Sequence, residues 1–159
     1  MDRRELIMNI MNLEVKTRRL NVFSLLELSP PFEMEILSCV RKGGDKGVRV
    51  SEIAKSLFTT SPNISRLLKV LEKDGKVYRE VDEQDRRNTF VHITDKGIEY
   101  FLHNRKTICE FMFGVINCLS DEELSKYSEI RAKIYSSYLA EIDKYKERAA
   151  ETENKGVQK

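Results

Sequence analysis

The chain has 159 residues, of which 40% are hydrophobic and 34% are charged, and its formal net charge is +2. This length suffices for one sizeable core and argues against two independent domains. The sequence contains no apolar run of the roughly 18 residues that a membrane span needs, no secretion signal after its first residues, and no paired cysteine spacing. We therefore expect a largely helical protein of the cytoplasm without membrane association. Any surface for nucleic acid must come from local clusters of charge.

Residues 4–23 have the apolar spacing of an amphipathic helix. Asn21 is the weakest point of this helix, because asparagine competes for backbone hydrogen bonds and favours helix ends. Ser29 and Pro30 then form the signature of a helix start, with the serine as N-cap and the proline at the first helical position. This second helix is expected to end at the Gly43-Gly44 pair.

Two short helices joined by a polar turn follow, which is the pattern of a helix-turn-helix. The first covers residues 51–58 and has Ser51 as its predicted cap. The second starts at Ser61-Pro62 and ends at Gly75, a residue suited to a left-handed position. One apolar face of the second helix consists of Ile64, Leu67, Leu68 and Leu71.

The opposite face of this second helix is polar and basic. It consists of Pro62, Asn63, Ser65, Arg66 and Lys69, and Ser61 at the helix start could also reach bases or phosphates. Short hydrogen-bonding side chains and an arginine near the start of a helix suit the base edges of the major groove, where asparagine pairs with adenine and arginine with guanine. The alternative is an ordinary solvated helix face that is capped by Ser61.

Two predicted strands, Val77–Val81 and Thr89–Ile93, enclose a polar segment and form a β-hairpin. The segment between them contains Asp85, Arg86 and Arg87. An arginine pair on a projecting ribbon suits the narrow, electronegative minor groove of DNA. Alternatively, the arginines only keep the turn soluble and pair with neighbouring acidic residues. An aspartate partner would orient an arginine in either case.

The rest of the chain is predicted to be helical: Thr94-Asp95 caps one long helix, and the capping box of residues 120–123 starts another. The predicted parts are an N-terminal helix and connection (1–28), a winged helix-turn-helix lobe (29–97), C-terminal helices (98–147) and a frayed tail (148–159). The terminal helices have longer apolar stripes than the small central lobe can bury, which predicts a homodimer. The alternative is that these helices pack on one another within one chain.

The helix and hairpin together resemble the MarR family of bacterial winged-helix regulators. The resemblance is strong over residues 51–97 and is one of pattern only in the terminal helices. It rests on residues 65–75, on Arg79 and on the wing, where the family pattern D-x-R-x-x-x-V-x-L-T falls on Asp85, Arg87, Val91, Ile93 and Thr94. Isoleucine at 93 in place of leucine is a volume-conserving change.

This resemblance implies a mainly α fold with a small β-hairpin wing and with N- and C-terminal dimerisation helices. By analogy, Arg87 enters the minor groove of double-stranded DNA, Asp85 holds it, and the helix from Ser61 reads the major groove. The resemblance also implies a repressor that binds a palindromic operator as a homodimer. A small-molecule effector would bind between the dimerisation helices and the DNA-reading lobe.

Other functions have weak support in the sequence. His92 and His103 are the only histidines, and no cluster of ligands predicts a metal site. Cys39, Cys109 and Cys118 fall on or near apolar helical faces, where a buried, unreactive thiol is the usual state. No catalytic constellation or phosphate loop is visible, so we expect neither an enzyme nor a cofactor. The remaining alternative is a winged-helix module for protein–protein contact without DNA binding.

Overall fold

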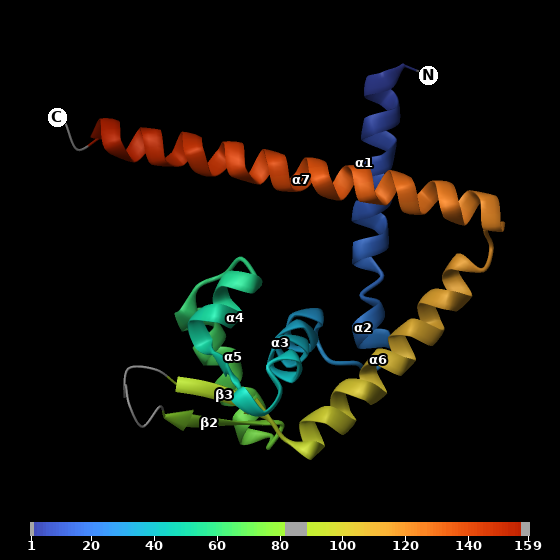
Figure 1. The fold of residues 1–159 in the computed structure, drawn as a ribbon. Coiled ribbons are helices and arrows are strands. Elements are labelled where there is room, and N and C mark those ends of the chain that lie inside the picture. The colour runs from blue at the N-terminus through green and yellow to red at the C-terminus, as the bar shows by residue number, and fades with distance from the viewer. Residues whose placement is uncertain (1, 82–88, 157–159) are drawn as a thin grey trace. The chain divides into compact units, whose positions relative to one another are not determined.

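The computed structural model describes residues 2–81 and 89–156, with side chains as far as Arg148. Its internal contacts divide the chain into two units, Met1–Phe111 and Met112–Lys159. The second unit contains the end of α6 and α7 (Asp121–Gly156). The first unit contains α1 (Arg3–Arg19), α2 (Val22–Leu25), α3 (Pro31–Lys42), the 3-10 turn η1 (Gly44–Lys46), β1 (Val48–Arg49), α4 (Val50–Ser56), α5 (Ser61–Lys73), β2 (Val77–Val81), β3 (Thr89–Ile93) and most of α6 (Asp95–Ile116) (Figure 1).

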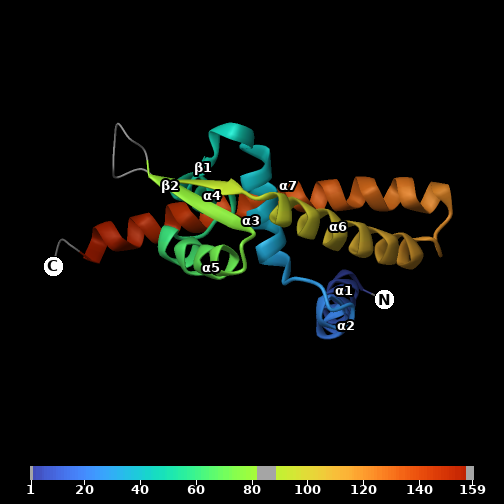
Figure 2. The same ribbon diagram turned by 90° about the horizontal axis from the view of Figure 1, so that it is seen from below.

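The strands form one antiparallel sheet in the order β1-β3-β2. β2 and β3 have the bounds that the sequence predicts, and their register pairs Val81 with Thr89. The short strand β1, which precedes the helix-turn-helix, pairs Val48 with Val91. Helices α3, α4 and α5 with this sheet make a winged helix, so the predicted fold class, mainly α with a small sheet, is confirmed (Figure 2).

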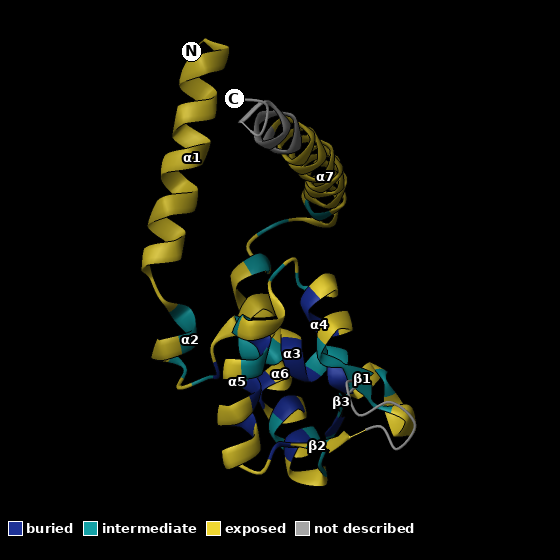
Figure 3. Cartoon of the chain, turned by 90° about the vertical axis from the view of Figure 1, so that its left-hand side faces the viewer, coloured by how far each residue is buried: buried dark blue, intermediate teal, exposed yellow. Residues whose placement is uncertain are grey.

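The hydrophobic core of the first unit lies among α3, α4, α5 and the sheet, where the buried residues gather (Figure 3). Its buried apolar side chains are Ile36, Leu37, Val40, Ile53, Ala54, Ile64, Leu68, Leu71, Val77, Val91 and Phe101. Three of the four residues predicted for the apolar face of α5 are among them, and Leu67 packs against them half-buried. By contrast, every residue of α1 is exposed in the single chain.

The N-caps of three helices differ from the predicted ones by one or two residues. Helix α3 begins at Pro31 rather than Pro30, and the Ser29 hydroxyl donates to Glu33 instead of capping the helix. Helix α4 begins before Ser51, and α5 begins at Ser61 itself with Thr60 as N-cap. In each case the residue before the helix has an extended backbone, and this conformation rather than the serine hydroxyl marks the N-cap.

The predicted N-terminal helix is interrupted rather than continuous to residue 23. Helix α1 ends at Arg19, and α2 starts at Val22 after Asn21, whose backbone is left-handed with a φ of 45°. Asparagine tolerates this conformation better than most residues because its short polar side chain bonds locally. The predicted weak point is therefore a true helix end.

Helix α7 starts with the predicted capping box. The Glu123 carboxylate accepts the Ser120 backbone N–H at 2.8 Å, and the Ser120 hydroxyl accepts the Glu123 N–H at 3.3 Å. The helix continues to Gly156, although the composition of residues 148–159 predicts fraying. None of the helices in residues 2–81 and 89–156 is long and apolar enough to cross a membrane.

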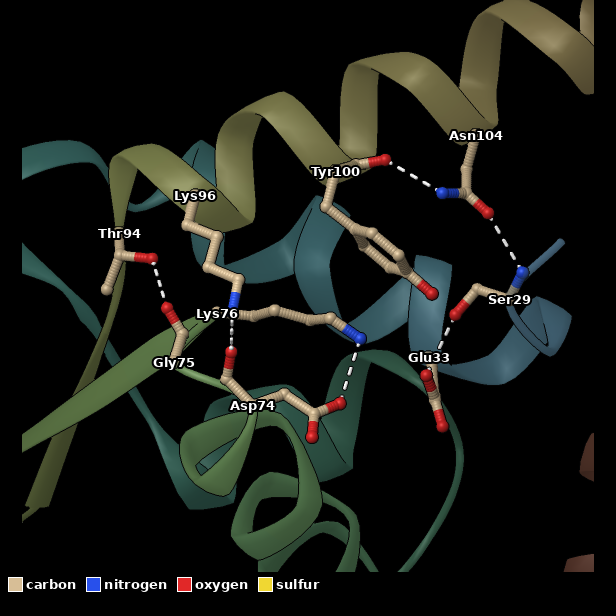
Figure 4. Close-up of polar contacts among 9 residues, drawn as sticks. All are labelled: Ser29, Glu33, Asp74, Gly75, Lys76, Thr94, Lys96, Tyr100 and Asn104. Atoms are coloured by element: carbon tan, nitrogen blue, oxygen red, sulfur yellow. Dashed lines mark hydrogen bonds and ion pairs between the residues drawn. The ribbon is translucent and has the colours of Figure 1, made fainter.

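The first turn of α6 packs against the junction between α5 and β2 (Figure 4). Gly75 has a φ of 70°, the left-handed conformation that the sequence predicts there. The Thr94 hydroxyl donates to the Gly75 carbonyl oxygen at 2.7 Å, and the Lys96 ammonium donates to the Asp74 carbonyl oxygen at 2.7 Å. These donors satisfy carbonyl groups that the end of a helix leaves without partners. Thr94 also caps α6 as predicted, because its hydroxyl accepts the Gly97 N–H at 3.0 Å.

Lys76 is a buried charged residue at the same junction, with a side chain that is 11% exposed. Its ammonium lies 3.0 Å from the Asp74 carboxylate and 3.8 Å from the ring centroid of Tyr100 (Figure 4). Burial by itself would lower the pKa of Lys76, but the hydrogen bond and charge of Asp74, together with Tyr100, outweigh burial and raise the pKa above 10.5. The charged form of Lys76 therefore stabilises the junction.

Gly97 allows the closest approach at this junction, because a Cβ at this position would collide with the backbone carbonyl of Lys76. We predict that Gly97→Ala lowers the free energy of unfolding by about 1–3 kcal/mol, as overpacking of a rigid backbone contact does. Gly114→Ala on the same helix is the control: nothing lies within 4 Å of its Cβ position, and alanine should raise stability by about 1 kcal/mol. Urea denaturation measures both; equal effects of the two substitutions would refute the close contact.

The raised pKa of Lys76 predicts a loss of stability at alkaline pH. Its stabilising contribution is fully present below the usual value of 10.5 and is lost as the pH rises through the higher pKa of the folded state. The difference in unfolding free energy between wild type and Lys76→Met should therefore be constant near neutral pH and shrink above about pH 10.5. A difference that stays constant through the alkaline range would contradict this role.

Candidate nucleic-acid interface

The residues predicted to contact DNA fall into two groups. Ser61, Asn63, Ser65, Arg66 and Lys69 all lie on α5 within the described part of the chain. The wing residues Asp85, Arg86 and Arg87 lie in residues 82–88, which are outside the described residues. Their roles stay predictions from the sequence, whereas the geometry of α5 is open to examination.

Helix α5 separates its side chains into a core face and a solvent face. Its apolar face is buried in the core, whereas Ser61, Arg66 and Lys69 are exposed and Asn63 and Ser65 are half-buried. The exposed residues lie in the first two and a half turns of the helix. A helix held on one side by a core and exposed on the other can enter a groove without unfolding the lobe.

Side-chain hydrogen bonds pre-arrange the exposed face. The Asn63 amide nitrogen donates to the Thr59 hydroxyl at 3.0 Å, and the Asn63 amide oxygen accepts from Arg66 Nη2 at 3.0 Å. Arg66 is thereby held near the start of α5 before any ligand is present, which reduces the side-chain entropy that it would lose on binding. Asn63 keeps a second N–H and a second lone pair for a base edge.

The first backbone N–H groups of α5 can donate hydrogen bonds to a further acceptor. Thr60 makes no side-chain hydrogen bond to the first turn, and the second helical residue is Pro62, which has no N–H of its own. The remaining N–H groups of the first turn point out of the helix end, together with the positive end of the helix dipole. This geometry suits a phosphate oxygen.

One arginine joins α5 to the hairpin. Arg79 on β2 donates from Nη2 to the Ser65 carbonyl oxygen at 3.1 Å, and its Nε lies 3.6 Å from the Glu72 carboxylate. The second contact is an ion pair without a hydrogen bond, because 3.6 Å exceeds hydrogen-bond distance. The Arg79 side chain thus links α5 to the strand that leads to residues 82–88.

Two residues of this surface, Thr59 and Arg79, have no role derived from the sequence, although Arg79 belongs to the residues that carry the family resemblance. Thr59 could have been found, since it lies four residues before Asn63 and that spacing brings side chains together on a helical turn. The contact of Arg79 with Ser65 spans a helix end and a turn, so no local spacing predicts it.

The other candidate residues do not form a second site. In the described ranges, no three side chains among histidine, cysteine, aspartate and glutamate gather as a metal site would require. His92 lies in β3, stacked on Tyr78 with ring centroids 4.9 Å apart, and His103 is exposed on α6. Cys109 and Cys118 are exposed, so the expectation that they are buried is wrong for the single chain.

An apolar pocket of about 250 Å³ lies in the first unit among α2, α3 and α6. Its lining is largely apolar, with a few polar groups at hand. The lining residues are Phe23, Leu28, Ser29, Pro31, Met34, Glu35, Ser38, Phe101, Asn104, Arg105 and Ile108. At one wall, the buried Asn104 amide oxygen accepts the Ser29 backbone N–H at 2.8 Å (Figure 4).

Comparisons with known proteins show what this part of the chain is similar to. A model of the MarR family matches residues 27–88, which include α3 to β2. The uncharacterised HTH-type transcriptional regulator YkoM of Bacillus subtilis is 33% identical over 70 residues, which are 44% of this chain and 44% of YkoM. The match thus spans under half the length of that relative.

Solved structures extend the likeness over most of the chain. A mutant of the S. aureus protein MepR is 25% identical with a TM-score of 0.64, covering 84% of this chain and 96% of that chain. The S. aureus MepR–DNA complex is 24% identical with a TM-score of 0.64, covering 86% of this chain and 99% of that chain. The family model, the relative and the solved structures thus agree that the chain contains a winged helix similar to that of MarR-family proteins.

Proposed function

We propose that this protein is a sequence-specific regulator of transcription that binds double-stranded DNA through α5 and the hairpin, and that it acts as a repressor. The observation that carries the proposal is the exposed face of α5, on which Asn63, itself bonded to Thr59 just before the helix, accepts a hydrogen bond from Arg66, with Lys69 also exposed. The MepR–DNA complex shows that a protein of this fold binds DNA.

Each group of the surface suits a different part of the duplex. Arg66 would bind the O6 and N7 atoms of a guanine, and Asn63 would bind an adenine, in the major groove. Ser61, Ser65 and Lys69 and the first N–H groups of α5 would bind bases or phosphates. For the wing, the sequence alone supports entry of Arg87 and Arg86 into the minor groove, with Asp85 holding Arg87.

A homodimer would bring two such surfaces to one duplex. Support comes from large apolar side chains that stay exposed in the single chain along α1 and α7, among them Leu6, Ile7, Ile10, Ile130 and Tyr138. Soluble monomers rarely expose so much apolar surface along whole helices. A two-fold dimer would bind half-sites about 34 Å apart, which predicts a palindromic operator.

A small-molecule effector would bind in the apolar pocket among α2, α3 and α6. Its volume of about 250 Å³ suits a small, mainly apolar molecule. Such a ligand would change DNA binding only if it favoured one arrangement of α3 and α6 over another. The hydrogen bond between Asn104 and Ser29 at the pocket wall joins α6 to the segment that precedes α3, so a ligand in the pocket would lie beside this link.

The DNA-binding proposal predicts that removing one basic residue of α5 weakens DNA binding strongly and that removing another hardly changes it. Arg66→Ala should weaken binding to a duplex selected from a random pool by roughly tenfold or more, because one good bidentate contact to a base contributes about 1–3 kcal/mol. Lys73→Ala removes the same charge from the last turn of α5 and should have little effect. Fluorescence anisotropy with a labelled duplex measures both.

Two results would overturn the proposal. Equal losses for Arg66→Ala and Lys73→Ala would mean that only general charge matters. Absence of salt-dependent binding of the wild type to any duplex would favour the alternative, a winged-helix module for protein–protein contact.

The dimer proposal is tested by mass in solution. Sedimentation should give twice the chain mass of 18.6 kDa. Ile10→Glu, which places a charge in the apolar stripe of α1, should shift the protein toward the monomer, whereas Asn12→Glu on the same helix should leave the dimer intact. A monomeric wild type, or equal effects of the two substitutions, would refute an interface on α1.

A further inference from the structure

Arg79 is placed where the hairpin meets the DNA-reading helix, and it does not take part in the core. Its side chain is 23% exposed and lies against α5, which runs beside β2 (Figure 2). Its two partners, the Ser65 carbonyl oxygen and the Glu72 carboxylate, are both on α5 and are seven residues apart. A spacing of seven returns to the same face of a helix after two turns. One guanidinium therefore holds α5 along two of its turns.

The contact is not needed to form either element. In an α-helix the Ser65 carbonyl already accepts the N–H of the residue four positions later, so the bond from Arg79 is an additional one. Strand β2 is paired along its length with β3, and Arg79 lies opposite the buried Val91. Glu72 is 40% exposed and would be solvated without its partner. What the arginine determines is the position of the two elements relative to each other.

The position of the bonded carbonyl is specific. Ser65 immediately precedes Arg66, the residue proposed to read a base, and it lies on the same helix turn as Asn63. At its other end, Arg79 belongs to the strand that continues into residues 82–88, the predicted wing segment. A shift of about 1 Å between two such parts is enough to spoil a pre-organised site.

We propose that Arg79 is a positioning residue for DNA recognition, which sets α5 and the β2 strand in the register that engages two grooves of one operator at once. This inference rests on the DNA-binding function proposed above. Arg79 itself does not touch DNA in this proposal. Its loss leaves the core and the charged contacts in place but lets the Ser65–Arg66 part of α5 shift slightly against the hairpin, so the protein loses discrimination between sequences rather than attraction to DNA.

The test compares Arg79→Met with Arg41→Met, which removes the same charge from α3, where Arg41 lies over the Phe101 ring rather than against α5. Affinity is measured for a selected duplex and for a scrambled duplex over a range of salt concentrations, and thermal unfolding shows that each variant is folded. Arg79→Met should raise the Kd for the selected duplex about tenfold, as expected for loss of a charged hydrogen bond. The Kd for the scrambled duplex and the salt slope should stay at the wild-type values, and Arg41→Met should behave as wild type.

Two conservative variants keep the test decisive if Arg79→Met does not fold. Arg79→Lys can reach the Ser65 carbonyl but cannot hold two partners with a planar fork, so it should restore part of the discrimination. Glu72→Gln removes the exposed ion pair and keeps the bond to Ser65, and should raise the selected-duplex Kd by no more than about fivefold.

Clear outcomes would overturn the inference. If Arg79→Met lowered the salt slope by about 0.9, Arg79 would be a phosphate contact and not a positioning residue. If the folded variant discriminated between the two duplexes as well as the wild type does, the contact would be structural only. Failure of the wild type to bind any duplex would instead refute the proposed function, so the two failures are distinguishable.

Discussion

The close approach of α6 to the end of α5 is the constraint on which the rest of the first unit depends. Gly97 has no side chain to keep the Lys76 backbone away, and the Thr94 and Lys96 side chains satisfy the last carbonyl groups of α5. Because these contacts include backbone atoms, they permit little sliding. The Lys76 ammonium adds an ion pair with Asp74 and a cation–π contact with Tyr100 to the same junction. The C-terminal end of α5 is therefore fixed to α6.

The C-terminal end of α5 is fixed, and the surface proposed to read DNA lies at its N-terminal end. The first turns of α5 have no comparable backbone contact with α6, and side chains take over: Thr59 and Asn63 hold Arg66, and Arg79 holds the Ser65 carbonyl. These contacts and the buried Ile64 and Leu68 hold the first turns of α5 in place, so that the side chains proposed to read DNA are arranged before a duplex binds.

In the proposed function, α6 connects the effector pocket to the helix that would read DNA. Helix α6 contributes Thr94 and Lys96 to the end of α5, and its Asn104 to the wall of the apolar pocket. A ligand that displaced α6 would also displace α5, because the close backbone contacts between them permit little movement of one helix relative to the other. The apolar residues of α1 and α7 are exposed in the described part of the chain, and the proposed dimer would cover them with a second copy.

The sequence by itself determined the elements that local signals encode. Two strand-like segments on either side of a polar turn located the hairpin, apolar spacing located the core face of α5, and Gly75 and the Ser120 capping box marked helix ends. Serine caps were misplaced by one or two residues, because several adjacent residues can occupy the N-cap and only the backbone conformation chooses among them. Only the tertiary structure decided the contacts of Arg79 with α5, of Asn104 with Ser29 and of Gly97 with Lys76. Each of these joins residues from different elements, and no local spacing in a sequence encodes the packing that brings such residues together.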